Sequence, residues 1–421
     1  MLPVLTKNKN VLLSHKQTNG KELYLYKLLG SMISFENTEI AFGGKSNSDL
    51  TWSYRLFNLM GKPWLVKFGK VATNVAFKLH LPVKGMIKAT IFKQFCGGET
   101  IKDCEQKTAD LGKFNIGTIL DYSVEGKTSN EDLDESKDEI ISTILKAKTS
   151  QNIPFSVFKP TGIARFDLLE RTNDITSDIT QEDKEELAKA MLRVDAICKT
   201  AYESKVPLFV DAEDSWIQDG IDRMVNAMMA KYNKEEVIIY NTIQMYRHDR
   251  LEFLKKSHQS AKMGGYKIGM KIVRGAYMEK ERERAQKMNY TDPINPNKPA
   301  TDKCYDDAVK YCIDNLEDIS FCAGTHNENS SEKLAQLIKA NNINKSDKRI
   351  YFAQLLGMSD HISFNVAHNG YNVAKYVPYG PIEEVMPYLI RRAEENTSVA
   401  GQMGRELGLI VKEKARRKTI K

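Results

Sequence analysis

Two adjacent arginines, Arg391 and Arg392, lie near the end of the run NVAKYVPYGPIEEVMPYLIRRAEEN at 372–396. Residues 383–396 begin with acidic side chains and predict a helix, because negative charge stabilises a helix N-terminus. Neighbouring helical positions point about 100° apart, so two guanidinium groups can approach one small ligand from different sides. Arginine's planar fork suits carboxylates. The pair therefore indicates a carboxylate-binding site, with an ordinary pair of surface arginines as the alternative.

A second cationic group lies in KIGMKIVRGAYMEKER at 267–282. Lys271 and Arg274 belong to an apolar run that ends at Gly275 and Ala276, whose small size lets the backbone approach a flat ligand. Positive charge beside a flavin ring stabilises the ring's reduced anion. The alternative is a strand that ends in a solvated arginine. No GxGxxG motif follows a first strand, so a Rossmann-type nucleotide site is not supported.

Eight short β-rich runs, each followed by a longer helical pattern, must position these groups. This alternation predicts parallel strands that close into a (β/α)8 barrel of the TIM type. The runs are 117–122, 155–159, 207–211, 237–242, 267–275, 319–325, 349–354 and 372–377.

Nearly every run stops at a polar residue, and the strand ends of such a barrel meet on one face. We therefore expect the terminal side chains to converge on one pocket. The alternative is that they only mark where the strands reach solvent. These residues are Asp121, Lys159, Asp211, Asn241 with Gln244, Arg274, His326, Gln354 and Tyr376.

The two ends of the chain differ from the barrel region in their pattern of apolar and basic residues. Residues 1–110 predict a helical N-terminal arm or cap, and residues 111–421 the barrel with a basic C-terminal tail. Within 50–95, apolar residues and lysines recur at helical spacing, which favours a scaffold packed on the barrel. A membrane-surface helix is the alternative. The basic segment 411–421 predicts a frayed, solvated end or, alternatively, an electrostatic tether to an anionic membrane.

The composition of the 421-residue chain excludes several classes of protein. No apolar stretch reaches the ~18 residues that span a bilayer. The six cysteines form no CxxC pair, which argues against a zinc site or a disulfide framework. The net charge of +7 comes with no nucleic-acid-binding motif. We expect a reducing, cytoplasmic compartment, with peripheral attachment to the inner membrane as a further expectation.

Six motifs resemble, in order, the series of the proline dehydrogenase family. They are DAEDS (211–215), NTIQMY (241–246), RGAY (274–277), GTHN (324–327), QLLGMSD (354–360) and KYVPYG…YLIRRAEEN (375–396). The insert YTDPINP at 290–296 resembles eukaryotic-type members, and the similarity covers roughly 110–399. It implies a distorted barrel that binds FAD non-covalently, oxidises L-proline to Δ1-pyrroline-5-carboxylate and passes the electrons to a quinone.

The resemblance also implies roles for individual residues. Lys159, Arg391 and Arg392 match the clamp on the proline carboxylate. Tyr376 and Leu355 match contacts to the proline ring, and Asp211 matches an aspartate that holds the tyrosine and arginine side chains. The flavin-contacting positions are Gln244, Val273, Arg274, Gly275, Ala276, Thr301, His326 and Glu395, with Lys271 beside them. Some bacterial members carry arginine where Lys271 stands, and lysine offers no bidentate fork.

Hydride removal from a carbon next to nitrogen needs a cofactor, because no side chain accepts two electrons. A cationic clamp and desolvation would lower the pKa of the proline amine, so a dedicated base is not required. Three alternatives stay open. A hydroxyproline dehydrogenase is disfavoured because Tyr376 would crowd the ring hydroxyl. Lys159 could instead form the Schiff base of a barrel aldolase. A barrel that only binds a partner is the third.

Overall fold

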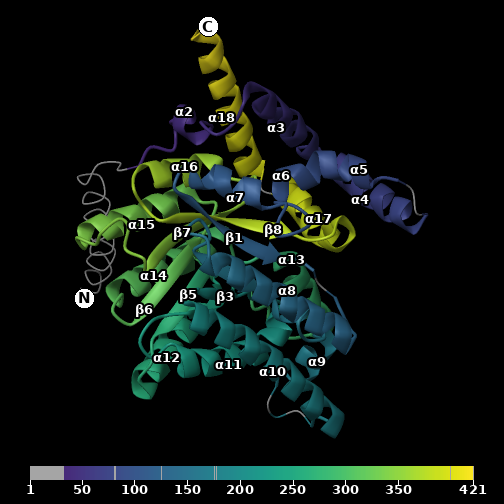
Figure 1. The fold of residues 1–421 in the computed structure, drawn as a ribbon, viewed down its shortest axis with the longest axis vertical. Coiled ribbons are helices and arrows are strands. Elements are labelled where there is room, and N and C mark those ends of the chain that lie inside the picture. Colours follow the sequence, from purple (N-terminus) through teal and green to yellow (C-terminus); the bar gives the residue numbers. More distant parts are fainter. Residues whose placement is uncertain are drawn as a thin grey trace, which may run out of the picture.

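The computed structural model describes residues 33–79, 82–124, 126–174, 176, 178–398 and 400–420. Parallel strands close into a barrel in chain order, which confirms the predicted (β/α)8 architecture (Figure 1). Each predicted run overlaps one strand, although β1, β4, β7 and β8 extend beyond their runs by one or two residues. The strands are β1 (Ile116–Tyr122), β2 (Phe155–Phe158), β3 (Leu208–Val210), β4 (Ile239–Gln244), β5 (Ile268–Val273), β6 (Ile319–Gly324), β7 (Ile350–Leu355) and β8 (Val373–Tyr379).

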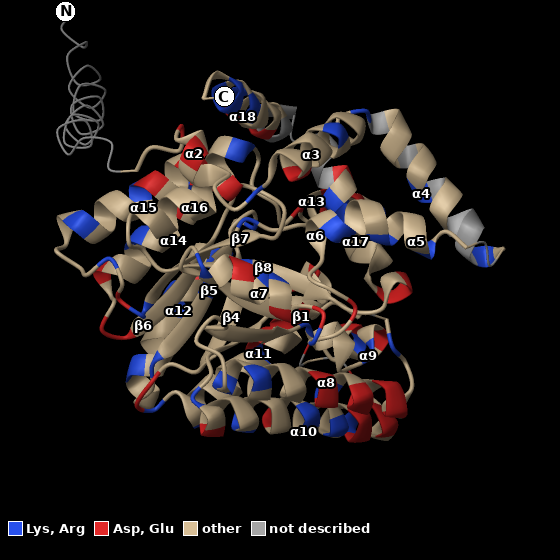
Figure 2. Cartoon of the chain, turned by 45° about the horizontal axis from the view of Figure 1, so that its top comes forward, with Lys and Arg blue, Asp and Glu red and all other residues tan. Residues whose placement is uncertain are grey.

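Helices connect the strands and cover the outside of the barrel (Figure 1). Longer helices are α8 (Asn130–Lys148), α10 (Gln181–Ser204), α11 (Ser215–Tyr232), α12 (Arg250–Gly264), α14 (Lys298–Asp314) and α15 (Glu328–Ala340). Shorter ones are η2 (Pro160–Gly162), α9 (Phe166–Arg171), α13 (Met278–Met288) and α16 (Asp360–His368). Ser129 and Thr180 cap α8 and α10, and acidic residues gather in the first turns of both helices (Figure 2), where the helix dipole favours them.

The interior of the barrel changes from aromatic to charged toward the strand ends. Phe155 stacks on Phe209 with ring centroids 4.3 Å apart, and Tyr240 and Tyr351 meet Phe155 edge-on. Side chains alternate along a strand, so the residue two positions later faces the same interior. Asp211 lies two positions after Phe209 and begins a layer of charged groups, which is closer to the strand ends than the aromatic residues.

The described residues before β1 are largely helical, as predicted. They include α2 (Thr38–Ala41), α3 (Asn47–Met60), α4 (Pro63–Lys78), α5 (Lys84–Ile87), η1 (Lys88–Phe92), α6 (Lys93–Phe95) and α7 (Glu105–Gly112). Most of the buried apolar residues among them form one cluster with those of α17 (Ile382–Ser398) and α18 (Ala400–Thr419). Phe57, Phe95, Leu389 and Ile410 are examples. Over the described residues, every helix is too short or too polar to span a bilayer.

The basic C-terminal segment differs from its prediction. Helix α18 continues to Thr419 and lies against the arm (Figure 1). Lys412 binds Glu36 at 3.0 Å, and Arg417 donates to the carbonyl of Phe42 at 2.9 Å. The expectation of a frayed end is therefore wrong for the described residues, because these cations find carboxylates and carbonyls on the arm.

Candidate active site

Five side chains form a continuous chain of charge at the strand ends, here called the charged layer: Asp121, Lys159, Tyr376, Asp211 and Lys271. Lys159 Nζ lies 2.6 Å and 2.8 Å from the two carboxylate oxygens of Asp121 and 3.5 Å from the Tyr376 hydroxyl. Tyr376 donates to Asp211 at 2.7 Å, and Lys271 pairs with the other Asp211 oxygen. Strands β1, β2, β3, β5 and β8 thus bring together residues far apart in sequence.

The electrostatics of the charged layer favour fixed protonation states. Burial would raise the pKa of Asp211, but the charges of Lys271 and Lys159 outweigh it and lower that pKa. Burial raises the pKa of Tyr376 well above its usual value, and Asp121 and Asp211 add to the effect. Tyr376 therefore stays a neutral donor, and Asp211 stays a carboxylate that accepts.

Leu355 joins the barrel interior to α17. It packs against the interior cluster that contains Tyr376 and also against the cluster formed by α17 and the arm. Helix α17 follows β8 after a turn in which Gly380 has φ +145°, as the sequence predicted. This places the arginine-bearing helix directly after the strand that carries Tyr376.

The arginine pair acts electrostatically on two different strand ends. Arg392 lies over the ring of Tyr388 at 5.2 Å, and its charge helps to lower the pKa of His326 after β6. Burial raises the pKa of Asp214 after β3, and the charges of Lys280 and then Arg391 oppose that rise. Arg392 thus acts on the end of β6 and Arg391 on the end of β3. That both arginines contact one ligand together with Lys159 stays a prediction.

Arg274 is held by three partners and a ring. Its Nε donates to Asp302 at 2.8 Å, and its two terminal nitrogens donate to Thr325 at 2.7 Å and Ser330 at 2.9 Å. Its guanidinium also lies 4.3 Å from the Tyr305 ring centroid. Thr301 is buried next to Asp302 on α14, so the structure brings Thr301 and Arg274 to the same neighbourhood.

His326, which follows β6, is a neutral imidazole. Burial is the main cause that lowers its pKa to about 3, and the charges of Lys375, Arg392, His361 and Arg274 contribute. Its Nδ1 lies 2.9 Å from the hydroxyl of Ser359. An uncharged ring at this position can either donate or accept at its other nitrogen.

The geometry of the remaining predicted cofactor residues fits a flat polar ligand. Gln244 is buried at the end of β4, and its Oε1 has no hydrogen-bond partner among the described residues. Gly275 has φ +122°, and a Cβ there would lie 2.5 Å from the Tyr246 ring. Gly275 and Ala276 are exposed, while Val273 ends β5 with its carbonyl bound to Met245 N at 2.8 Å. The side chain of Glu395 lies outside the described residues.

Sequence reasoning expected Asp121 among the strand-end residues of the pocket but gave it no individual role, and it did not single out Ser359. Asp121 pairs with Val157 in the register of β1 and β2, and alternation along β2 then puts Lys159, two residues later, on the same side as Asp121. Ser359 has φ +51° in a connecting loop, and no sequence pattern marks its contact with His326. Both residues contact predicted site residues directly.

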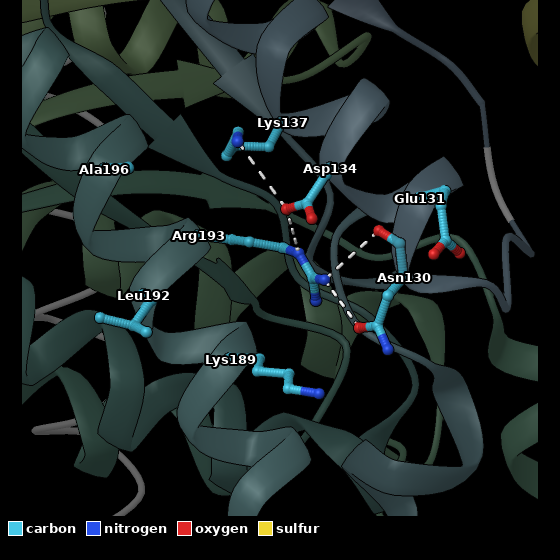
Figure 3. Close-up of a pocket in the computed structure, with 8 residues that line it drawn as sticks. All are labelled: Asn130, Glu131, Asp134, Lys137, Lys189, Leu192, Arg193 and Ala196. Carbon is cyan, nitrogen blue, oxygen red and sulfur yellow. Dashed lines mark hydrogen bonds and ion pairs between the residues drawn. The ribbon is translucent and has the colours of Figure 1, made fainter.

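A separate hollow of about 490 Å³ lies between α8 and α10 (Figure 3). Its centre is Arg193, which binds Asp134 at 2.9 Å and the Asn130 side chain at 2.8 Å. These are helix-to-helix contacts on the outer layer, so the hollow is not part of the strand-end site.

The fold and the site define a (β/α)8-barrel enzyme with the charged layer at its strand ends. The sequence profile described as "Proline dehydrogenase" matches residues 104–405. The chain belongs to the proline dehydrogenase family.

Similarity to individual proteins supports the same family. The chain is 33% identical to "Proline dehydrogenase 1, mitochondrial" of Dictyostelium discoideum, over 90% of this chain and 74% of that protein. It is 32% identical to "Proline dehydrogenase 2, mitochondrial" of Arabidopsis thaliana, over 84% of this chain and 83% of that protein.

Among solved structures, proline utilization A (PutA) from Bdellovibrio bacteriovorus superposes with a TM-score of 0.66 at 18% identity. The match covers 86% of this chain but 36% of PutA. At that identity the superposition supports the fold alone.

Proposed function

We propose that this enzyme oxidises L-proline to Δ1-pyrroline-5-carboxylate with bound FAD and passes the electrons to a quinone. The observation that carries the proposal is the charged layer, in which Lys159 Nζ lies 3.5 Å from the Tyr376 hydroxyl. Helix α17, which bears Arg391 and Arg392, follows the strand of Tyr376. A small amino acid with one carboxylate and one ring matches this combination of cations and apolar contacts.

Lys159, Arg391 and Arg392 would bind the proline carboxylate. Lys159 now faces the carboxylate of Asp121, so its ammonium is already oriented within the barrel. Guanidinium groups add planar, directional donors. Three cations around one carboxylate fix one end of the substrate and favour an anion over a neutral ligand.

Tyr376 and Leu355 would fix the plane of the proline ring. The hydrogen bond to Asp211 holds the phenol, and Leu355 contacts both neighbouring clusters. The cations would also lower the pKa of the substrate amine, so that the neutral amine is available. Positioning of this kind can lower a reaction barrier by several kcal/mol.

Gln244, Arg274, Thr301, His326 and Glu395 would hold the FAD, with Lys271 and the 273–276 backbone beside it. Bound FAD would supply the two-electron acceptor that side chains lack. The fixed charge of Arg274 and the backbone exposed at Gly275 and Ala276 support this assignment.

The test is an absorption spectrum of the purified protein, followed by anaerobic addition of L-proline. We expect a yellow chromophore that bleaches with proline. A protein that is colourless after incubation with FAD and removal of the unbound FAD would overturn the cofactor assignment, and a yellow protein that proline does not bleach would overturn the substrate.

The alternatives make different predictions. Hydroxyproline would place a hydroxyl near Tyr376, so we expect it to react less efficiently than proline. Equal efficiency would contradict this. A Schiff-base aldolase needs a neutral lysine, whereas Lys159 is paired with Asp121 at 2.6 Å. Borohydride trapping of a substrate on Lys159 would favour the aldolase, and tight proline binding without dye reduction would favour a binding protein.

We further propose that residues 1–110 form a cap, 111–421 form the catalytic barrel, and the arm contacts a membrane where a quinone dissolves. Helix α4 lies at the edge of the molecule (Figure 1), with Trp64 66% and Phe68 67% exposed. Exposed aromatic residues on such a helix favour a lipid interface. The proposed attachment is peripheral, from the cytoplasmic side of an inner membrane or, as the relatives' names suggest, within mitochondria.

Co-sedimentation with vesicles of anionic and zwitterionic lipid tests this contact. Trp64→Ser with Phe68→Ser should lower binding, while Met263→Ser on α12, which is more exposed at 78%, should not. Equal binding of both variants would contradict the role of α4.

A further inference from the structure

Helix α18 reaches the candidate site through one buried carboxylate. Glu406 Oε1 accepts the backbone N–H of Ser359 at 2.5 Å and lies 3.4 Å from the Ser359 hydroxyl. The same hydroxyl lies 2.9 Å from His326 Nδ1. Glu406 and Ser359 are both buried, so Ser359 links the last helix of the chain to the end of β6.

The Ser359 hydroxyl carries one proton, which either Glu406 or His326 can accept. If the proton goes to Glu406, His326 must donate from Nδ1, and both contacts become hydrogen bonds. If it goes to His326, the ring carries its proton on Nε2, and the carboxylate loses one donor. An ionised buried carboxylate favours the first arrangement, because bonds to charged acceptors are stronger and an unmet buried charge is costly.

We propose that Glu406 is a positioning residue that holds His326 as the Nδ1–H tautomer through Ser359. The other ring nitrogen, Nε2, is then an acceptor. Two tautomers are available because the lowered pKa of His326 keeps the ring neutral at physiological pH, with a proton on one nitrogen only. The consequence for FAD rests on the proposed function, since His326 is one of the cofactor residues.

The groups around Glu406 act on its pKa in both directions, and that pKa is raised overall. Burial raises the pKa of Glu406, and Asp360 adds to this effect, while His361, the Ser359 N–H and Lys375 oppose it. Lys45 of the arm also interacts electrostatically with Glu406. Glu406 therefore faces two lysines, one histidine and one aspartate, drawn from the arm, α16 and β8.

Side-chain nitrogen NMR of the full-length protein with isotope-labelled histidine tests the proposal, with His326→Gln assigning the signal. We expect the Nδ1–H tautomer in the wild type at pH ~8, where a carboxyl group is ionised. In Glu406→Gln the charge is lost, and the hydroxyl turns to the nearer acceptor, 2.9 Å against 3.4 Å away. We therefore expect the Nε2–H tautomer in that variant.

Two further variants keep the test decisive. Glu413→Gln changes another buried carboxylate of α18 that contacts Arg416 and Arg417, and it should leave His326 unchanged. Ser359→Gly removes the hydroxyl and suits φ +51°, so adding Glu406→Gln to it should not alter the tautomer.

Wild-type His326 in the Nε2–H form would overturn the proposal, even if Glu406→Gln failed to fold. An unchanged tautomer in a folded Glu406→Gln variant would do the same. Neither result depends on proline oxidation, so failure of the proposed function would be seen separately, as a wild-type protein that proline does not reduce.

Discussion

Tyr376 on β8 donates its phenolic hydrogen to Asp211 after β3, with 2.7 Å between the oxygens. We expect Tyr376→Phe to keep the ring contact and lose this bond. A hydrogen bond to a charged group contributes about 1.5–3 kcal/mol, so kcat/KM for proline should fall by about tenfold or more. Steady-state kinetics with a quinone analogue measure this, and an unchanged kcat/KM would show that the phenol plays no part.

Lys159 and Asp121 form a buried ion pair. Variants of the pair can distinguish an effect on substrate binding from an effect on the stability of the fold. Lys159→Met should lower kcat/KM for proline by about 100-fold, because truncating one partner of a buried charge pair costs about 2–5 kcal/mol. It should also lower the free energy of unfolding by about 3 kcal/mol, since Asp121 loses its cation.

The double variant Asp121→Asn with Lys159→Met provides the control. It removes both charges, so denaturant unfolding should show that stability recovers while activity does not. Lys199→Met, on an exposed lysine, should alter neither. Recovery of activity in the double variant would mean that Lys159 acts only through stability.

The sequence predicted the strand-end residues better than their partners. Lys159, Asp211 and Tyr376 each end or lie within a recognisable β-rich run, so the barrel geometry alone predicted that they converge. Their pairing could not be predicted, because whether Lys159 turns to Asp121 or to solvent depends on packing across β1 and β2. Helix α18 shows the same limit. The sequence predicted solvated cations there, because their partners, such as Glu36 and the Phe42 carbonyl, come from a distant part of the chain that only the fold brings close.

Gly275 adopts a conformation that a larger residue would strain. We expect Gly275→Ala to lose bound flavin and at least about tenfold of activity, because its Cβ would meet the Tyr246 ring at 2.5 Å and φ is +122°. Gly408→Ala on α18 has open space and should be neutral or slightly stabilising. Visible absorption per protein and thermal unfolding report both effects; full flavin content in Gly275→Ala would contradict the close approach.

Acid should loosen α18. Burial would raise the pKa of Glu413, but hydrogen bonds from Arg416 and Arg417 outweigh it and lower that pKa to about 2. A lowered folded-state pKa stabilises the fold above the unfolded value of about 4.3, and this contribution is lost as pH falls from there through about 2. The stability difference between wild type and Glu413→Gln should therefore shrink between pH ~5 and ~2, as measured by chemical denaturation. A constant difference would show that Glu413 does not titrate in this window.

The carboxylate clamp is the centre of the account, and a comparison of proline with pyrrolidine tests it most directly. Pyrrolidine has the same ring and amine but no carboxylate. In anaerobic rapid mixing, L-proline should bleach the flavin, and pyrrolidine at equal concentration should do so at least about 100-fold more slowly, since the ion pairs are absent. Equal rates for the two compounds, or no bleaching by proline, would contradict the account.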